Sequence, residues 1–381
     1  MSVLFAPLDV GDFTIANRIG MSAMARNRAD ATRVPNHIMK KYYLQRALGG
    51  AGLIVTEATS ISPHGSLYDR TPGIWSMEQV AGWKRITNVV HLAGSKIYCQ
   101  LWHAGRLANS EGPLAGPFLP EQGKAVFLIF QSLSNTELRL TFKTHLQPTE
   151  IQDPAVFVDL YRDAARNAKL AGFDGVEREL LHAANGFLVD QFLDSTSNVR
   201  TDKWGGSIEN RARFGLEVLK ALVEVFGSNV SVKVTPGRGY NDMKMPLEED
   251  TVETFNYLLS EADKLRLSYI TLSRYIPDLE DHKIGAGSST THDVLSAYTK
   301  LITNAKIFLD GGVTPKEAEE LVKAGKVDGV FFGMSWLTHP DLAKRIRHGK
   351  RTENTAVIAH LYGDANVEPY LGYTDYPSVT Y

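Results

Sequence analysis

The stretch KIFLDGGVTP, residues 306–315, leads from a strand into a helix. Its first half is apolar and typical of a strand buried in a parallel sheet, and Gly311-Gly312 ends that run. Thr314 followed by Pro315 is the pattern of a helix N-cap with proline at the first helical position. An amphipathic stretch follows, and then a second apolar run, GVFFG. This order of strand, helix and strand predicts a parallel βαβ unit.

The same alternation recurs along nearly the whole chain. The predicted strands are Ile19–Met24, Gly52–Thr59, Lys96–Trp102, Asp174–Glu177, Val230–Thr235, Tyr269–Ser273, Lys306–Asp310 and Gly329–Gly333. The predicted helices are Asn36–Leu48, Glu78–Leu92, Ala155–Leu170, Ile208–Phe226, Glu249–Leu265, His292–Thr303, Pro315–Ala324 and Pro340–Arg347. Eight such repeats within 381 residues predict an α/β protein, a single (β/α)8 TIM barrel that occupies residues 1–381 as one domain.

One segment, residues 113–148, fits none of the repeats. We expect it to leave the barrel after the third strand and to cap the barrel mouth. Within it, Val126–Phe130 and Leu138–Phe142 have the pattern of a hairpin.

Composition and charge are those of an ordinary soluble globular protein. Lys and Arg total 41 and Asp and Glu total 43, so no overall charge directs the chain to nucleic acid or an acidic membrane. The longest apolar run, Ala125–Phe130, is too short for a membrane helix, and the N-terminus lacks a signal-peptide pattern. The one cysteine, Cys99, excludes an intrachain disulfide and favours a reducing compartment. We expect a cytoplasmic protein, monomer or homodimer, whose partner is a small-molecule substrate.

Motifs identify the chemistry more sharply than composition does. The chain has no Gly-rich dinucleotide fingerprint, no P-loop and no His pairs at metal spacing, so we expect no metal site. After the fourth predicted strand come HAANGFLVDQFL, at His182–Leu193, and NVRTDKWGGSIENR, at Asn198–Arg211. Together with QLWHAGR at residues 100–106 and GYTDYP at residues 372–377, they make the chain resemble the old yellow enzyme family of FMN-dependent oxidoreductases.

The resemblance implies an ene-reductase, which passes hydride from NADPH or NADH through FMN to an α,β-unsaturated carbonyl compound. In the family, the His and Asn of a His-x-x-Asn motif donate hydrogen bonds to the substrate carbonyl, and His182 and Asn185 match them. Phe187 stands where the family has the tyrosine that donates a proton. The residues expected to line the substrate site are Trp102, Tyr240, Tyr275 and Tyr373.

The resemblance also implies where FMN binds. Gln100 would face the pyrimidine edge of the ring, while glycines after the last two strands would let the backbone approach the phosphate. The implied cofactor-binding residues are Ala23, Met24, Ala25, Ala58, Gln100, Lys233, Gly311, Gly312, Gly333 and Met334.

Several of these positions depart from the family pattern. Phe187 cannot donate a proton, so the substrate proton needs another source. Ala25 replaces a Thr or Cys that touches the flavin. Lys233 and Met334 replace arginines beside the ring and the phosphate, so the first change keeps a positive charge and the second loses one. We expect FMN to bind more weakly. We also expect the flavin to have a shifted reduction potential and to remain redox-active.

An insertion precedes the His-x-x-Asn motif. Arg178–Leu181 occupies a place where the family has one residue, so a bulge or a longer strand must absorb three more. An odd insertion left fully extended would turn His182 to the opposite face. We expect the extra residues to loop out and leave the site intact.

Three alternatives remain open. Phe187 favours a flavin-dependent isomerase, in which the hydride returns to a rearranged intermediate. Phe187, Met334 and the insertion together favour a degenerate FMN binder. Lys233, at a strand end, is suited to a Schiff-base lyase, although nothing else in the chain resembles one.

Overall fold

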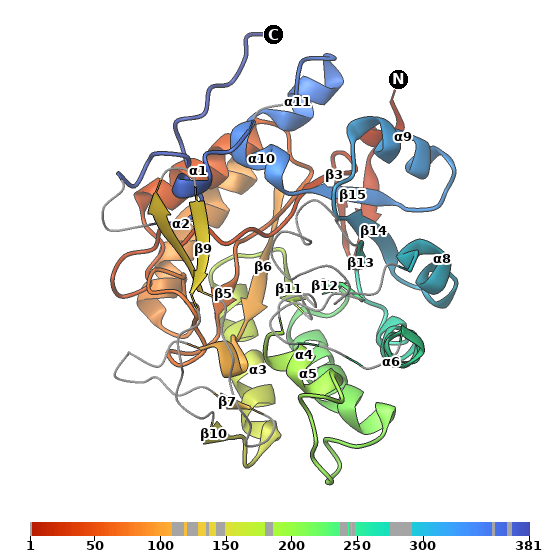
Figure 1. Ribbon diagram of the computed structural model, residues 1–381. Coiled ribbons are helices and arrows are strands. Elements are labelled where there is room, and N and C mark those ends of the chain that lie inside the picture. The colour runs from red at the N-terminus through yellow and green to blue at the C-terminus, as the bar shows by residue number, and fades with distance from the viewer. Residues whose placement is uncertain are drawn as a thin grey trace.

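Eight parallel strands close into a barrel in the computed structural model (Figure 1). The structure describes residues 2–108, 118–119, 129–134, 137–141, 149–179, 186–236, 243, 245, 248–274, 292–352, 355–363 and 368–381. The barrel strands are β3 (Ile19–Met21), β4 (Leu53–Val55), β6 (Lys96–Trp102), β11 (Gly175–Glu179), β12 (Val230–Val234), β13 (Tyr269–Ser273), β14 (Lys306–Asp310) and β15 (Gly329–Phe332). They pair in this order, and β15 pairs with β3 to complete the ring. The predicted (β/α)8 barrel is confirmed.

β3 and β4 end earlier than predicted, at Met21 and Val55, whereas β11 ends later. This strand runs two residues beyond its predicted end, because Arg178 and Glu179 continue the ladder opposite Val232 and Lys233 of β12. Part of the insertion is therefore absorbed by a longer strand. The residues that follow, 180–185, lie outside the described part of the chain.

Helices surround the barrel (Figure 1). They are α1 (His37–Leu48), α2 (Met77–Leu92), α3 (Pro154–Leu170), α4 (Leu188–Leu193), α5 (Ile208–Phe226), α6 (Glu248–Asp263), α8 (Val294–Tyr298), α9 (Pro315–Lys323), α10 (Met334–Thr338) and α11 (Leu342–Arg347). Thr314 accepts a hydrogen bond from the Glu317 N–H at 3.2 Å, so the predicted cap of α9 is confirmed. The eighth predicted helix, Pro340–Arg347, corresponds to α11, and α10 before it was not predicted.

Alternation along the strands builds two apolar layers. Ile97, Cys99 and Leu101 of β6 belong to the large core between the barrel and its helices. Tyr98, between them, belongs instead to a smaller cluster together with Phe308. Because side chains alternate between the two faces of a strand, this second cluster fills the barrel interior.

A hairpin that the sequence analysis did not predict completes the inner cluster. β1 (Leu8–Val10) and β2 (Phe13–Ile15) pair antiparallel, and their apolar side chains join the cluster in the barrel interior. The Asp12 N–H at the turn donates to Asn229, one residue before β12, at 3.0 Å. The hairpin therefore covers the N-terminal ends of the strands, which leaves the carboxyl ends as the mouth.

The segment after β6 contains short strands in its described parts. β8 (Ile129–Ser134) and β9 (Glu137–Thr141) pair antiparallel, so a hairpin forms with bounds shifted from those predicted. β7 (Phe118–Leu119) pairs with β10 (Thr149–Glu150). The capping role of this segment stays a prediction.

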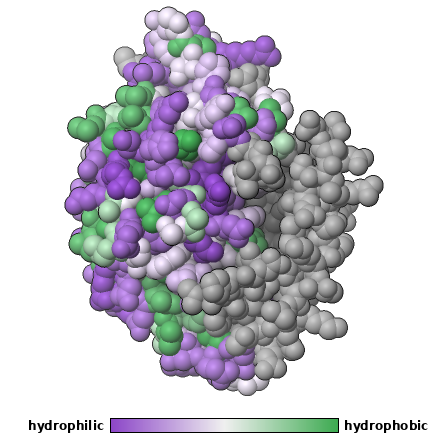
Figure 2. Space-filling model, turned by 90° about the vertical axis from the view of Figure 1, so that its left-hand side faces the viewer, coloured by the Kyte–Doolittle hydropathy of each residue, from purple (hydrophilic) through white to green (hydrophobic). Residues whose placement is uncertain are grey.

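The described surface mixes residue types. Hydrophobic and hydrophilic residues are interspersed on the face seen in Figure 2, as amphipathic helices around a barrel produce. Within the described ranges, no helix combines the length and the apolar character that crossing a membrane requires.

Candidate active site

The floor of the barrel mouth is polar. Gln100 of β6 donates a hydrogen bond from its amide to Glu177 of β11 at 3.0 Å. The other carboxylate oxygen of Glu177 accepts from the Tyr269 hydroxyl, also at 3.0 Å. Gln100 and Glu177 stand opposite each other in the ladder, and both are buried. Side chains from β6, from β11 and from β13, which lies one strand beyond β12, thus meet at a single carboxylate.

A second carboxylate lies beside the first. Asp310, the last residue of β14, forms an ion pair with Lys233 of β12, and both are buried. Ser22, just after β3, donates to Asp310 at 2.6 Å and accepts from Lys233 at 3.1 Å. The Gly311 N–H donates to the other oxygen of Asp310 at 2.7 Å.

Burial and the neighbouring charges shift the pKa values of these groups. Burial raises the pKa of Glu177, although the Lys233 charge and the two hydrogen bonds act against it. Burial would also raise the pKa of Asp310, but the closer Lys233 and the hydrogen bond from Ser22 bring it below its usual value. Burial and the neighbouring Glu177 raise the pKa of the Tyr269 phenol. The lysine therefore favours the anion at Asp310 more than at Glu177.

One wall of the mouth is apolar. Trp102 follows Gln100 on the same face of β6 and meets Phe187 edge to face, with ring centroids 5.0 Å apart. Ala58 packs into the same cluster. Three residues predicted for the site, from three different loops or strands, are thus brought together. The Trp102 indole N–H is buried without a hydrogen-bond partner among the described residues, which leaves a donor for a ligand.

Glycines end the neighbouring strands. Gly311 has φ +102°, and a Cβ there would lie 2.7 Å from the Arg274 carbonyl oxygen, so only glycine fits. Gly333 begins α10 and has room beside it, since a Cβ would meet only the Met24 sulfur at 3.7 Å. Met334 is 52% exposed. Gln100 and Lys233 at the floor, together with the open space beside Gly333, fit a flat heteroaromatic ring that carries a phosphate.

Tyr373 sits in a stack of aromatic and guanidinium groups. Its ring lies parallel to that of Tyr42, with centroids 4.1 Å apart, and Arg28 covers its other face. Arg26, one residue after Ala25, donates to the Gly372 carbonyl at 2.5 Å. The stack ties the C-terminal segment to the loop after β3. Because Tyr373 has no exposed surface, its contact with substrate stays a prediction.

Some predicted site residues lie outside the described part of the chain. These are His182, Asn185, Tyr240 and Tyr275. Their roles stay predictions from the resemblance.

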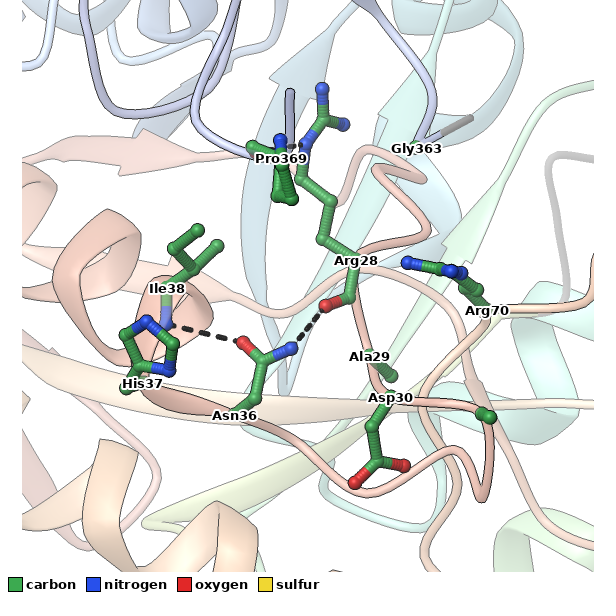
Figure 3. A pocket seen from close by; sticks show the side chains of 10 residues that line it. Arg28, Ala29, Asp30, Asn36, His37, Ile38, Arg70, Gly363 and Pro369 are labelled. Carbon is green, nitrogen blue, oxygen red and sulfur yellow. Dashed lines mark hydrogen bonds between the residues drawn. The ribbon is translucent and has the colours of Figure 1, made fainter. Parts of the chain in front are cut away.

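A hollow of about 300 Å³ lies elsewhere, where the loop after β3 and the start of α1 meet the C-terminal segment (Figure 3). The Asn36 side chain spans it, accepting from the Ile38 N–H and donating to the Arg28 carbonyl. None of the residues predicted for the flavin lines this hollow.

Sequence reasoning missed four members of the floor: Glu177, Asp310, Ser22 and Tyr269. Two signals could have found the carboxylates. Asp310 ends an apolar strand immediately before Gly311, and Glu177 follows Val176 at a strand end. A charged residue at the carboxyl end of a barrel strand is a site candidate in its own right.

Comparisons with known proteins agree with this geometry. The family described as the NADH:flavin oxidoreductase / NADH oxidase family matches residues 3–353. The NADP-dependent oxidoreductase lnbE of Aspergillus flavus is 37% identical, over 99% of this chain and 96% of its own. The chanoclavine-I aldehyde reductase fgaOx3 of Penicillium roqueforti is 38% identical, over 92% of this chain and 90% of its own.

A solved structure extends the likeness to three dimensions. The old yellow enzyme homologue from Zymomonas mobilis superposes with a TM-score of 0.85 at 32% identity, covering 98% of this chain and 99% of that one. The polar floor, the apolar wall and the glycine-ended strands lie at the barrel end where such folds bind ligands. The chain belongs to the NADH:flavin oxidoreductase / NADH oxidase family, as an FMN-dependent oxidoreductase of the old yellow enzyme type that takes its electrons from NADH or NADPH.

Proposed function

We propose that this protein reduces the carbon–carbon double bond of an α,β-unsaturated carbonyl compound. The observation that carries the proposal is that the polar floor and the apolar wall lie next to each other at the mouth. The floor includes the Gln100 amide, and the wall is formed by Trp102 and Phe187. Such a site suits a substrate with one polar oxygen and an apolar body. Bound FMN supplies the two-electron chemistry, as a carrier of hydride from NAD(P)H to the alkene.

The residues of this chain have separate tasks in the proposal. Gln100 and Lys233 hold the ring edge of FMN, and the backbone at Ala23, Met24 and Ala58 lines it. Gly311, Gly312 and Gly333 admit the phosphate next to backbone N–H groups.

Polarisation of the substrate belongs to His182 and Asn185. Two donors aimed at the carbonyl oxygen stabilise the negative charge that develops there, and removing one such donor costs on the order of 10²–10³ in rate. Trp102 and Phe187 form the apolar wall against which the alkene packs. Phe187 carries no exchangeable proton, so water or a second side chain protonates the α-carbon.

The Schiff-base alternative has less support. A nucleophilic lysine must be uncharged. Lys233 instead forms an ion pair with the buried Asp310.

The test is an anaerobic spectrum of the purified protein with FMN. NADPH or NADH should bleach the flavin absorbance, and 2-cyclohexenone should restore it, whereas the saturated cyclohexanone should not. Asn185→Ala should slow the restoration by enone on the order of 10²-fold and leave that by oxygen unchanged. A protein that takes up no FMN, or a flavin that neither nucleotide bleaches, would overturn the proposal.

Product analysis separates reduction from isomerisation. Because Phe187 offers no proton, hydride return is the second candidate outcome. Rearranged enone formed without consumption of nicotinamide would identify an isomerase, and saturated ketone in equal amount to the oxidised nucleotide would identify a reductase.

The setting of the enzyme is part of the proposal. We infer a single catalytic domain over residues 1–381, with residues 113–148 capping the mouth and selecting the substrate. We also infer a cytoplasmic enzyme that acts as a monomer or homodimer, which light scattering and cell fractionation would check.

A further inference from the structure

Asp310 occupies a position at the mouth for which the family resemblance assigned no role. It forms a closed triangle with Lys233 and Ser22, and each of the three residues is at most 8% exposed. The three residues come from β14, β12 and the end of β3. The triangle therefore spans the mouth instead of lying along one strand.

Both oxygens of Asp310 are occupied from within the protein. One accepts from the Gly311 N–H, and the other accepts from Ser22 and Lys233. Since these donors already use the carboxylate, Asp310 is not placed to bind a ligand itself. Any effect on a ligand passes through Lys233.

Lys233 still has capacity to bind. An ammonium group has three hydrogens, and within the described residues two of them have acceptors, on Ser22 and Asp310. The acceptors both belong to the triangle, which fixes the orientation of the ammonium group. One hydrogen remains for an acceptor on a ligand.

The charges at the floor oppose one another. Among the described residues of the floor, Lys233 faces two buried carboxylates, Asp310 and Glu177. At short range in a buried site, a paired carboxylate offsets much of the attraction that a lysine exerts on an anion. Reduced flavin is such an anion when its ring loses the N1 proton.

We propose that Asp310 is a positioning residue that sets how strongly the mouth binds reduced FMN relative to oxidised FMN, by orienting Lys233 and offsetting its charge. The inference rests on the proposed function, which places FMN at this mouth. The inference predicts that the midpoint potential of the bound flavin is lower than it would be if Lys233 had no carboxylate partner.

The experiment measures the dissociation constants of FMN in its oxidised and its dithionite-reduced state, together with the midpoint potential of the bound flavin. In Asp310→Asn, Lys233 is no longer offset, so reduced FMN should bind about tenfold more tightly relative to oxidised FMN. For a two-electron couple, that tenfold change is a rise in potential of about 30 mV. Asp310→Ser, a second neutral variant, should shift the ratio in the same direction. Asp310→Glu keeps a carboxylate and should keep the wild-type ratio.

A double-mutant cycle tests whether the effect passes through Lys233. Lys233→Met alone should weaken binding of reduced FMN about tenfold or more relative to oxidised FMN. In that background Asp310→Asn should change the ratio by less than about twofold, because the buried carboxyl has lost its cation and takes up a proton. Asp263→Asn is the matched control. That carboxylate also has a lowered pKa, but it accepts from the Thr303 and Ala305 N–H groups before β14 begins, so the ratio should not move.

The outcomes are distinguishable. Wild-type protein that binds no FMN overturns the proposed function and this inference with it. Normal FMN binding with an unchanged ratio in both neutral variants overturns the inference alone. So does a shift that persists in the Lys233→Met background, or one that Asp263→Asn reproduces. If both neutral variants fail to bind FMN in either oxidation state, Asp310 is needed for the structure of the site. That result would also overturn the inference.

Discussion

The two ends of the barrel interior differ in chemistry although the same strands build both. Tyr98 and Phe308 belong to the apolar plug at the bottom, whereas Gln100 and Asp310, two residues further along the same strands, belong to the polar floor. Two residues advance a strand by about 6.6 Å. Because residues two apart share a face, the difference shows that one strand face supplies stability at its start and ligand chemistry at its end.

The largest effect is expected at the plug. Phe308→Ala removes a fully buried ring that packs against Tyr269 and Phe331, and should lower the free energy of unfolding by about 4 kcal/mol. Urea denaturation followed by circular dichroism measures it. Leu92→Ala, at an 87% exposed position, should cost less than about 0.5 kcal/mol. A loss below about 1 kcal/mol at Phe308 would mean that the plug is not the source of stability.

Removing the cation of the floor comes next. Lys233→Met leaves Asp310 buried without its ion-pair partner and should cost about 3 kcal/mol at neutral pH. The exposed Lys220, paired with Glu217, is the control, and its replacement by Met should cost less than about 0.5 kcal/mol.

The same variant should reverse a pH dependence. In the wild type the pKa of Asp310 is lower in the folded than in the unfolded state. Its contribution to stability is therefore present above about pH 4 and is lost as the pH falls through the folded pKa. Without Lys233, burial raises that pKa, so the variant should regain stability relative to the wild type as the pH falls. An equal loss at pH 4 and pH 8 would contradict the ion pair.

A third variant tests the apolar wall of the mouth. Phe187→Tyr places a phenol against Trp102 and supplies the proton donor that the chain lacks. Reoxidation of reduced flavin by 2-cyclohexenone should speed up at least about tenfold, read by anaerobic stopped flow. Phe187→Leu, which removes the ring and adds no hydroxyl, should give no gain in the rate of reoxidation. If both variants match the wild type, proton donation does not limit the reaction.

The smallest effect is expected at Glu177. Burial raises its pKa in the folded state, so its contribution to stability is full below about pH 4 and declines as the pH rises through the folded pKa. Glu177→Gln removes this titration while retaining an acceptor for Tyr269 or Gln100. The variant should therefore gain stability relative to the wild type as the pH rises from 4 to 8, by about 1.4 kcal/mol for each unit by which burial raises the pKa of Glu177. A difference that does not change with pH would show that the Glu177 carboxyl does not titrate in this range.

Much of the fold could be predicted because its signals are local. The apolar runs and the Thr314-Pro315 cap each depend on a few adjacent residues, and each barrel strand overlaps its predicted range. The hairpin of β1 and β2 was missed because its strands are only three residues long and owe their stability to the barrel interior.

The site was predicted in part, through motifs that lie within short stretches. Gln100 and Trp102 share one motif, and the structure brings Trp102 together with Ala58 and Phe187. Nothing local marked Tyr269 as a partner of Glu177, since the two are 92 residues apart and meet only because β11 and β13 flank β12. The placement of His182 and Asn185 stays a prediction.

The sequence by itself determined the number and order of the eight barrel strands, because the spacing of apolar residues and the capping residues act over a few positions. Tertiary structure alone decided which polar groups share the mouth and what charge they carry. The pairing of β12 and β14 with β13 brings Asp310 to Lys233 across 77 residues, and both are buried there. At that distance in a dry interior their mutual attraction, and not their intrinsic chemistry, sets the charge that a ligand meets.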